Sequence, residues 1–137
     1  IFWRQTGSSY RTLFDGSGEQ AIVLRDSSLG VYADVGEQQG FFDSGYDVNL
    51  NKWSFVCAVG EGSASGGTST FYAAAPDEAS VQQAGSVARA VAGARLRSLG
   101  SEGRFPGKLA MYRCWNGAAL SREEVQSVFE ETLPLAA

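Results

Sequence analysis

The sequence predicts an all-β fold in which two antiparallel sheets pack face to face and one short helix lies near the C-terminus. Short runs of apolar, aromatic and β-branched residues recur along most of the chain. The 17 glycines, against 3 prolines, suit many tight turns between short strands. At 137 residues, with 44% hydrophobic and 19% charged residues, the chain is expected to form one globular domain over residues 1–137.

The first half of the chain is predicted to hold short strands between polar turns. In one of these runs Leu29 and Val31 alternate with Gly30 and Tyr32, as expected for a strand with one buried face. A polar turn is expected at residues 36–40. The predicted strands are residues 10–14, 21–24, 29–35, 41–42 and 46–50.

Residues 53–59 form the most hydrophobic run in the chain, and both of its faces are nearly apolar. This pattern predicts a central strand that is buried on both sides. The glycine- and serine-rich residues 60–67 are expected to form a flexible loop, and residues 68–74 the next strand.

The region of residues 79–99 fits a helix by its alanine content and short strands by its glycines and local alternation. The all-β context favours strands at residues 80–83, 87–91 and 95–99, followed by a last strand at residues 108–115. Ser121 and Glu124 then have the spacing of a capping box, which predicts a short helix that ends at Pro134.

The segment from Phe105 to Val125 resembles the ending of laminin-G-like, concanavalin A-like jelly-roll domains. In that family a glycine starts a strand, an aromatic–Asn pair ends it, and a Leu-Ser-x-Glu-Glu turn opens a short helix. Gly107, Trp115–Asn116 and residues 120–124 match these features, although one extra alanine precedes Leu120. Trp3 and residues 13–16, 24–32, 53–59 and 70–72 match earlier family strands in order, whereas residues 73–77 replace the usual Asp-Gly turn.

This resemblance implies an antiparallel jelly-roll sandwich with one short C-terminal helix. The fold hosts lectins, glucanases, adhesion modules and inert structural domains, so it does not specify a function. Large side chains facing inward from both sheets are expected to fill the core, and the candidates are Trp53, Phe55, Phe71, Tyr112 and Trp115.

Catalysis is not expected. Histidine is absent, which removes the usual general base and the commonest zinc ligand. Glucanases of this fold resemble one another in carrying two glutamates around an aspartate on one strand, and no Glu-x-Asp-x-Glu pattern occurs here. The adjacent pairs Glu123–Glu124 and Glu130–Glu131 fall on the predicted helix, where capping and a solvated face explain them.

Metal binding, if any, is expected to involve calcium, which relatives often hold with loop aspartates and carbonyls. No other cofactor is expected. Calcium takes six to eight oxygen ligands, and the densest oxygen cluster contains Asp43, Asp47, Asn49 and Asn51. The alternative is that these turn residues satisfy their own backbone through Asx-turns.

A ligand surface requires exposed aromatic side chains beside polar groups. If residues 41–42 lie in a strand, one of Phe41 and Phe42 must face away from the core. The outward residue is the best candidate for a contact surface. The candidate ligand-binding residues are Phe41, Phe42, Tyr46, Asp43 and Asn49, with Tyr10 and Tyr32 as further aromatic candidates.

Cys57 and Cys114 could form a disulfide if their strands were neighbours, but two free thiols used as small hydrophobic residues are favoured. The net charge of −4 and the lack of a basic stripe argue against a nucleic-acid partner, and no long apolar run predicts membrane insertion.

The leading hypothesis is a non-catalytic recognition module that binds a glycan or protein through surface loops and exposed aromatic residues. The alternative is a structural or accessory subunit that docks on a larger protein assembly without binding sugar. Secretion or an organelle lumen is favoured over the cytosol.

Overall fold

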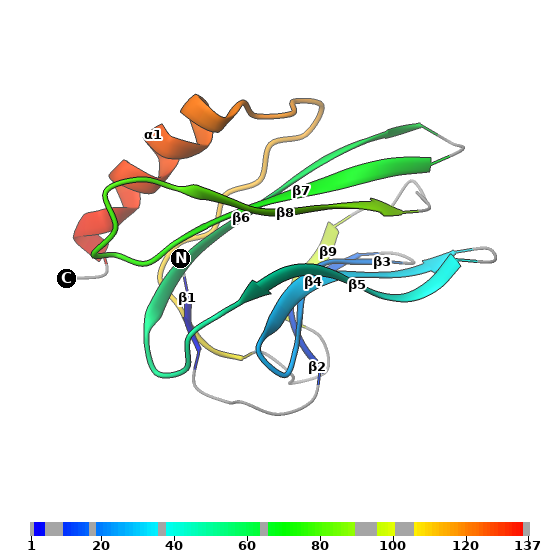
Figure 1. The fold of residues 1–137 in the computed structure, drawn as a ribbon, viewed down its shortest axis with the longest axis horizontal. Coiled ribbons are helices and arrows are strands. Elements are labelled where there is room, and N and C mark those ends of the chain that lie inside the picture. The colour runs from blue at the N-terminus through cyan, green and yellow to red at the C-terminus, as the bar shows by residue number, and fades with distance from the viewer. Residues whose placement is uncertain are drawn as a thin grey trace.

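The computed structural model of the chain contains two antiparallel sheets stacked face to face, with a helix over the outer face of one of them (Figure 1). It describes residues 2–4, 10–16, 19–35, 38–63, 66–89, 96–100 and 106–135. Within these residues each sheet has five strands, so the predicted all-β jelly-roll sandwich with one short helix is confirmed.

The helix-covered sheet has the strand order β10-β1-β6-β7-β8, and the second sheet has the order β5-β4-β3-β2-β9. The strands of the first are β10 (Gly107–Leu109), β1 (Phe2–Arg4), β6 (Trp53–Ser63), β7 (Gly66–Ala74) and β8 (Gln82–Arg89). Those of the second are β5 (Gln38–Asp47), β4 (Ser28–Val35), β3 (Glu19–Arg25), β2 (Tyr10–Gly16) and β9 (Leu96–Leu99).

The main core lies between the two sheets. On β4 the side chains of Leu29 and Val31 are fully buried, whereas Tyr32 faces the other side and is partly exposed. This is the alternation that the sequence predicts. The buried residues of this core are Phe2, Leu13, Ile22, Leu24, Leu29, Val31, Val48 and Phe71.

A second core lies between the first sheet and helix α1 (Arg122–Thr132). The ring centroids of Phe55 on β6 and Phe129 on α1 are 5.4 Å apart. On the other face of β6, Val56 and Ala58 pack against the inter-sheet core. The prediction of a central strand covered on both sides is therefore confirmed.

Helix α1 begins at the predicted capping box. The Ser121 hydroxyl accepts a hydrogen bond from the Glu124 backbone N–H at 3.3 Å, and the Glu124 carboxylate accepts one from the Ser121 N–H at 2.7 Å. The helix passes into a 3₁₀ turn, Leu133–Leu135, which contains the predicted terminator Pro134. No helix in the described part of the chain combines the length and hydrophobicity required to span a bilayer.

Several predicted boundaries are wrong because strands continue through glycine-rich sequence. β6 and β7 pair as far as Ser63 and Gly66, so the expected loop at residues 60–67 is mostly the end of a hairpin. Residues 38–47 form one strand, β5, with an irregularity between the residues that pair with Leu29 and Gly30. The predicted strands at residues 80–83 and 87–91 merge into β8, although residues 90 and 91 lie outside the described residues.

Gly85 explains why β8 tolerates a glycine in its middle. A Cβ atom at Gly85 would overlap the backbone carbonyl of Ser44 on β5. The edges of the two sheets meet here, since β5 packs against β8. Glycine thus allows a close backbone approach.

The last predicted strand, residues 108–115, is also only partly correct. Ladder pairing covers Gly107–Leu109, and residues 111–115 have no regular secondary structure. Trp115 is 40% exposed, so its predicted place in the core is wrong. Trp53 is partly exposed and belongs to neither core cluster, in contrast to Phe55 and Phe71.

Candidate functional site

The outer face of the second sheet carries a group of aromatic and charged side chains, here named the aromatic patch. It consists of Tyr10 on β2, Arg25 on β3, Tyr32 on β4, and Phe41 and Asp43 on β5. These residues lie on neighbouring strands, because Tyr10 pairs with Arg25 and Tyr32 pairs with Phe41. Side chains from four strands therefore form one continuous surface.

The Tyr10 ring contacts the other two rings of the aromatic patch edge to face. Tyr10 lies 6.0 Å from both Tyr32 and Phe41, measured between ring centroids, with interplanar angles of 84° and 69°. Such T-shaped pairs are the favoured geometry for aromatic quadrupoles. The rings support each other, so they present a preorganised surface.

The charged members of the aromatic patch lie beside Phe41. The Arg25 guanidinium carbon is 4.6 Å from the centroid of the Phe41 ring, a cation–π contact. Its Nη2 is 3.9 Å from Oδ2 of Asp43, and both side chains are exposed. An exposed ion pair of this kind contributes little to stability, so both groups can exchange this contact for a ligand.

The irregular part of β5, which follows Phe41, is held in place by hydrogen bonds of Asp43 and Ser44. Oδ1 of Asp43 accepts a hydrogen bond from the Gly45 N–H at 2.8 Å, which is an Asx-turn. The Ser44 hydroxyl donates to the Leu29 carbonyl at 2.7 Å and holds the irregular part of β5 against β4. One oxygen of Asp43 is thus used by the turn, and the other faces Arg25.

Of the predicted pair Phe41 and Phe42, the structure places Phe41 on the outer face, while Phe42 packs against the inter-sheet core. The predicted ligand-binding residue Tyr46 also packs against that core, so the structure does not bring Phe42 and Tyr46 into the aromatic patch. Burial, together with the nearby charge of Glu78, raises the pKa of Tyr46. Ser44 and Gly45 on β5 have no pairing partner on β4. Tyr46 therefore pairs with Leu29, and its side chain faces inward as that of Leu29 does.

Asn49 is exposed in the connection beyond β5, outside the strands that carry the aromatic patch. Arg25 was absent from the predicted set. It could have been found from the alternation of β3, because Leu24 is fully buried and its neighbour must point outward.

The candidate calcium ligands have other roles in the structure. Asp47 accepts hydrogen bonds from the hydroxyls of Ser27, at 2.7 Å, and Ser28, at 3.3 Å. Asn51 adopts a left-handed backbone conformation with φ of 57°. The described residues bring no three acidic or cysteine side chains into one group that could hold a metal ion. Asp43 and Asp47 therefore already have hydrogen-bond partners within the protein, and calcium binding at these residues stays a prediction.

The helix glutamates are also engaged. Besides the capping by Glu124, Glu130 accepts a hydrogen bond from the Gln126 amide at 2.8 Å. Glu131 forms an ion pair with Arg113 at 2.5 Å. These contacts match the predicted roles in capping and on a solvated helix face.

Both cysteines are free thiols in the structure, which is the favoured prediction. Cys57 lies on β6, and burial raises the pKa of its thiol to about 11. Cys114 is exposed.

Comparison with known proteins places this chain by family alone. No curated protein and no solved structure matches it. A laminin-G-type family model, described as the concanavalin A-like lectin/glucanases superfamily, matches residues 1–126. This range includes every strand of both sheets and the start of α1. The chain belongs to the concanavalin A-like lectin/glucanase superfamily.

Proposed function

We propose that the protein is a non-catalytic recognition module that binds a carbohydrate through the aromatic patch. The observation that carries this proposal is the position of Phe41. Its ring is half-buried on the outer face of a sheet, against the ring of Tyr10, with the Arg25 guanidinium over it and the Asp43 carboxylate close to that guanidinium.

The chemistry of the aromatic patch suits a sugar ring. One face of a pyranose is lined by C–H groups and packs on an aromatic surface, while its hydroxyls require hydrogen-bond donors and acceptors. Arg25 supplies only donors, Asp43 supplies acceptors, and the Tyr10 and Tyr32 hydroxyls can do both. An apolar surface with a few polar groups that fix orientation is the usual composition of a small-molecule site.

The location of the aromatic patch favours an extended ligand over an isolated monosaccharide. Helix α1 covers the outer face of the first sheet, whereas the outer face of the second sheet carries no helix among the described elements (Figure 1). An open face lets a long oligosaccharide lie across several strands. Because such a ligand is only partly desolvated, the affinity of one site should be modest.

The alternative function is that of a structural or accessory subunit whose aromatic patch contacts another protein. Tyrosine, arginine and other aromatic residues are also enriched in protein interfaces. In either case we expect the protein to work outside the cell or in an organelle lumen.

A glycan array probed with the wild-type chain and with Phe41→Ala tests the proposal. Binding to a defined oligosaccharide should fall at least about tenfold in Phe41→Ala, which corresponds to roughly 1.4 kcal/mol. Phe41→Trp should retain binding, because the stacking surface remains. Trp115→Ala is the matched control, since it removes an exposed aromatic side chain outside the aromatic patch.

Circular dichroism and thermal melts must show that Phe41→Ala stays folded. Equal glycan binding by wild type and Phe41→Ala would contradict the role of the aromatic patch. A wild-type protein that binds no glycan, but co-purifies in fixed stoichiometry with another chain, would favour the accessory-subunit function.

A further inference from the structure

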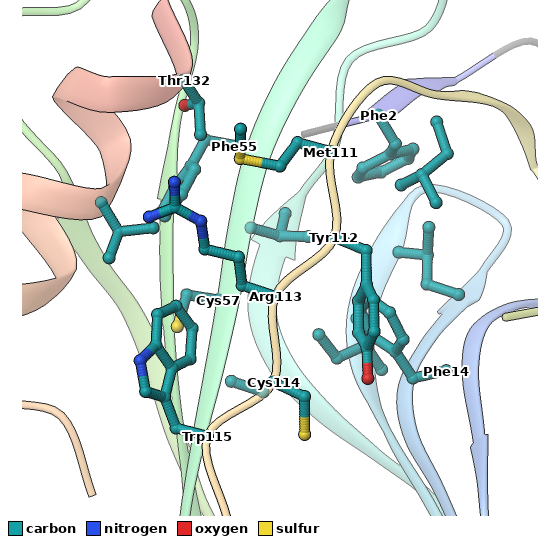
Figure 2. Close-up of a pocket in the computed structure, with 16 residues that line it drawn as sticks. Phe2, Phe14, Phe55, Cys57, Met111, Tyr112, Arg113, Cys114, Trp115 and Thr132 are labelled. Atoms are coloured by element: carbon teal, nitrogen blue, oxygen red, sulfur yellow. The ribbon is translucent and has the colours of Figure 1, made fainter. Parts of the chain in front are cut away.

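A cavity of about 160 Å³ lies between β6 and residues 111–115, and it is here named the sheet cavity (Figure 2). Residues 111–115 run beside β6 without regular secondary structure. Leu13 and Ile22 of the inter-sheet core line the sheet cavity, as do Phe55 and Val128 of the helix-side core. The sheet cavity therefore extends from one core to the other, past the edge of β6.

Charge is nearly absent from the described lining of the sheet cavity. Arg113 is the one charged lining residue in the described chain, and its guanidinium is paired with Glu131. Burial raises the pKa of the Cys57 thiol to about 11, so this group is neutral at physiological pH. The Thr132 hydroxyl donates a hydrogen bond to the Phe129 carbonyl at 2.7 Å. A charged molecule would lose its hydration here without gaining a counter-charge, so the cavity suits an uncharged occupant.

Aromatic rings and sulfur atoms make up much of the lining. Tyr112 points toward the inter-sheet core, where its ring centroid lies 5.0 Å from that of Phe14. Met111 and Trp115 point the opposite way, toward the helix side (Figure 2). Aromatic and sulfur-containing side chains both make favourable contacts with an aromatic ring, so the lining favours a flat ring over an aliphatic chain. The lining rings are those of Phe2, Phe14, Phe55, Tyr112 and Trp115, and the sulfur atoms are those of Cys57, Met111 and Cys114.

The volume of the sheet cavity limits the occupant to one ring. An apolar cavity of about 150 Å³ is large enough to bind benzene. A second cavity, of about 100 Å³, adjoins the sheet cavity and continues along β6 to Gly60. Cys57, Ala58 and Trp115 line both cavities. Together the two spaces accommodate a single six-membered ring that carries a small substituent.

The backbone edge of β6 decides what the substituent must be. In the described chain β1 pairs with β6 at Trp53 and Ser54, and no strand pairs with this edge of β6 beyond them. The opposite edge of β6 is paired with β7 as far as Ser63. An uncovered strand edge presents backbone N–H and C=O groups that require partners. A ligand with both a hydrogen-bond donor and an acceptor satisfies them, whereas a purely apolar ligand does not.

We propose that the sheet cavity binds a small, uncharged aromatic amide. The ring lies among the aromatic and sulfur-containing side chains, and the amide lies against the backbone of β6 near Ala58, where the two cavities meet. Cys114 and Trp115 line the sheet cavity and are exposed, so the ligand enters from their side. This site is separate from the aromatic patch, which lies on the outer face of the second sheet, and it does not depend on carbohydrate binding.

Calorimetric titration of the 137-residue chain with three one-ring probes tests the proposal. Benzamide should bind saturably, with a dissociation constant of about 1 mM or below. Toluene, which has the ring but no hydrogen-bonding group, should bind at least about tenfold more weakly. Benzoate should not bind at neutral pH, because its charge would be buried without a partner. Failure of benzamide to bind, or equal affinity for benzoate or toluene, would overturn the proposal.

A variant that fills the cavity locates the binding. Ala58→Leu places a larger side chain where the two cavities meet and should weaken benzamide binding at least about tenfold. Ala88→Leu is the matched control, since Ala88 is exposed on β8 and lines neither cavity. It should bind benzamide as the wild type does. Unchanged benzamide binding by a folded Ala58→Leu protein would overturn the proposal.

Hydrogen exchange of the wild-type chain gives a readout that does not depend on any variant. Benzamide at ten times its dissociation constant should slow exchange about tenfold for backbone amides of residues 55–60 that face the sheet cavity. Toluene should give less protection at the same fractional saturation, because it forms no hydrogen bond with β6. Benzamide protection confined to other parts of the chain would place the ligand elsewhere and overturn the proposal.

Discussion

The ring of Phe41 lies directly over the backbone of Gly30. A Cβ atom at Gly30 would come within 2.7 Å of two ring carbons of Phe41 and would overlap the carbonyl oxygen of Phe42. Glycine on β4 therefore creates the place in which the Phe41 ring lies. The stability of the sheet and the shape of the proposed ligand surface therefore both depend on the lack of a side chain at Gly30.

Gly30→Ala should destabilise the protein by about 1–3 kcal/mol, because the new methyl group overpacks against a neighbouring strand. Chemical denaturation of wild type, Gly30→Ala, Phe41→Ala and the double variant measures this as a double-mutant cycle. Removing the Phe41 ring should recover only part of the loss, since the Phe42 carbonyl is backbone and stays in place. A Gly30→Ala protein as stable as wild type would show that the strands can separate here at little cost.

Phe71→Ala should cost about 3–5 kcal/mol of unfolding free energy, since a fully buried ring is lost from the inter-sheet core. Trp53→Ala is the comparison, because Trp53 is partly exposed and lies outside both core clusters. Its cost should be smaller, about 1–2 kcal/mol. Urea unfolding of both variants checks the order, and a larger loss for Trp53→Ala would contradict the assignment of the core.

Ser121→Ala should destabilise the protein by about 1 kcal/mol, because it removes the acceptor for the Glu124 N–H at the start of α1. Ser127→Ala is the control, since that exposed hydroxyl only donates to the Glu123 carbonyl within the helix. The two variants should differ in melting temperature by several degrees. Equal melting temperatures would mean that the capping box contributes nothing measurable.

The Cys57 thiol should react slowly with iodoacetamide in the folded protein, because burial raises its pKa to about 11 from an ordinary value of 9.0. In a Cys114→Ser background, labelling at pH 8 should be roughly a hundredfold slower than in denaturant, since few molecules carry the thiolate. Equal rates in the folded and denatured protein would contradict this environment for Cys57.

The raised pKa of Cys57 also determines how its contribution to the free energy of unfolding changes with pH. The folded state holds the Cys57 proton more tightly than the unfolded chain does, so this contribution is complete below pH 9.0. It declines as the pH rises toward about 11. A Cys57→Ala variant should therefore lose less stability than wild type between these pH values, as measured by denaturant midpoints.

Local patterns in the sequence were sufficient for much of the fold. The alternation of Leu29 and Val31 with Tyr32 predicts one buried face of β4, and both apolar faces of residues 53–59 predict a central strand. The spacing of Ser121 and Glu124 predicts the helix start. These features depend on side chains within a few residues of one another, so sequence spacing specifies them.

The outcomes that required the tertiary structure all depend on register between distant segments. Sequence alone showed that one of Phe41 and Phe42 faces outward, and the pairing of β5 with β4 determined that it is Phe41. That pairing also turned Tyr46 inward, and the assembled sheet brought Arg25 beside Phe41. Trp115 follows a strand that stops at Leu109 and is left partly exposed. Alternation predicts two faces, but only the packing of one sheet on another, with irregular pairs between strands, decides which face is buried.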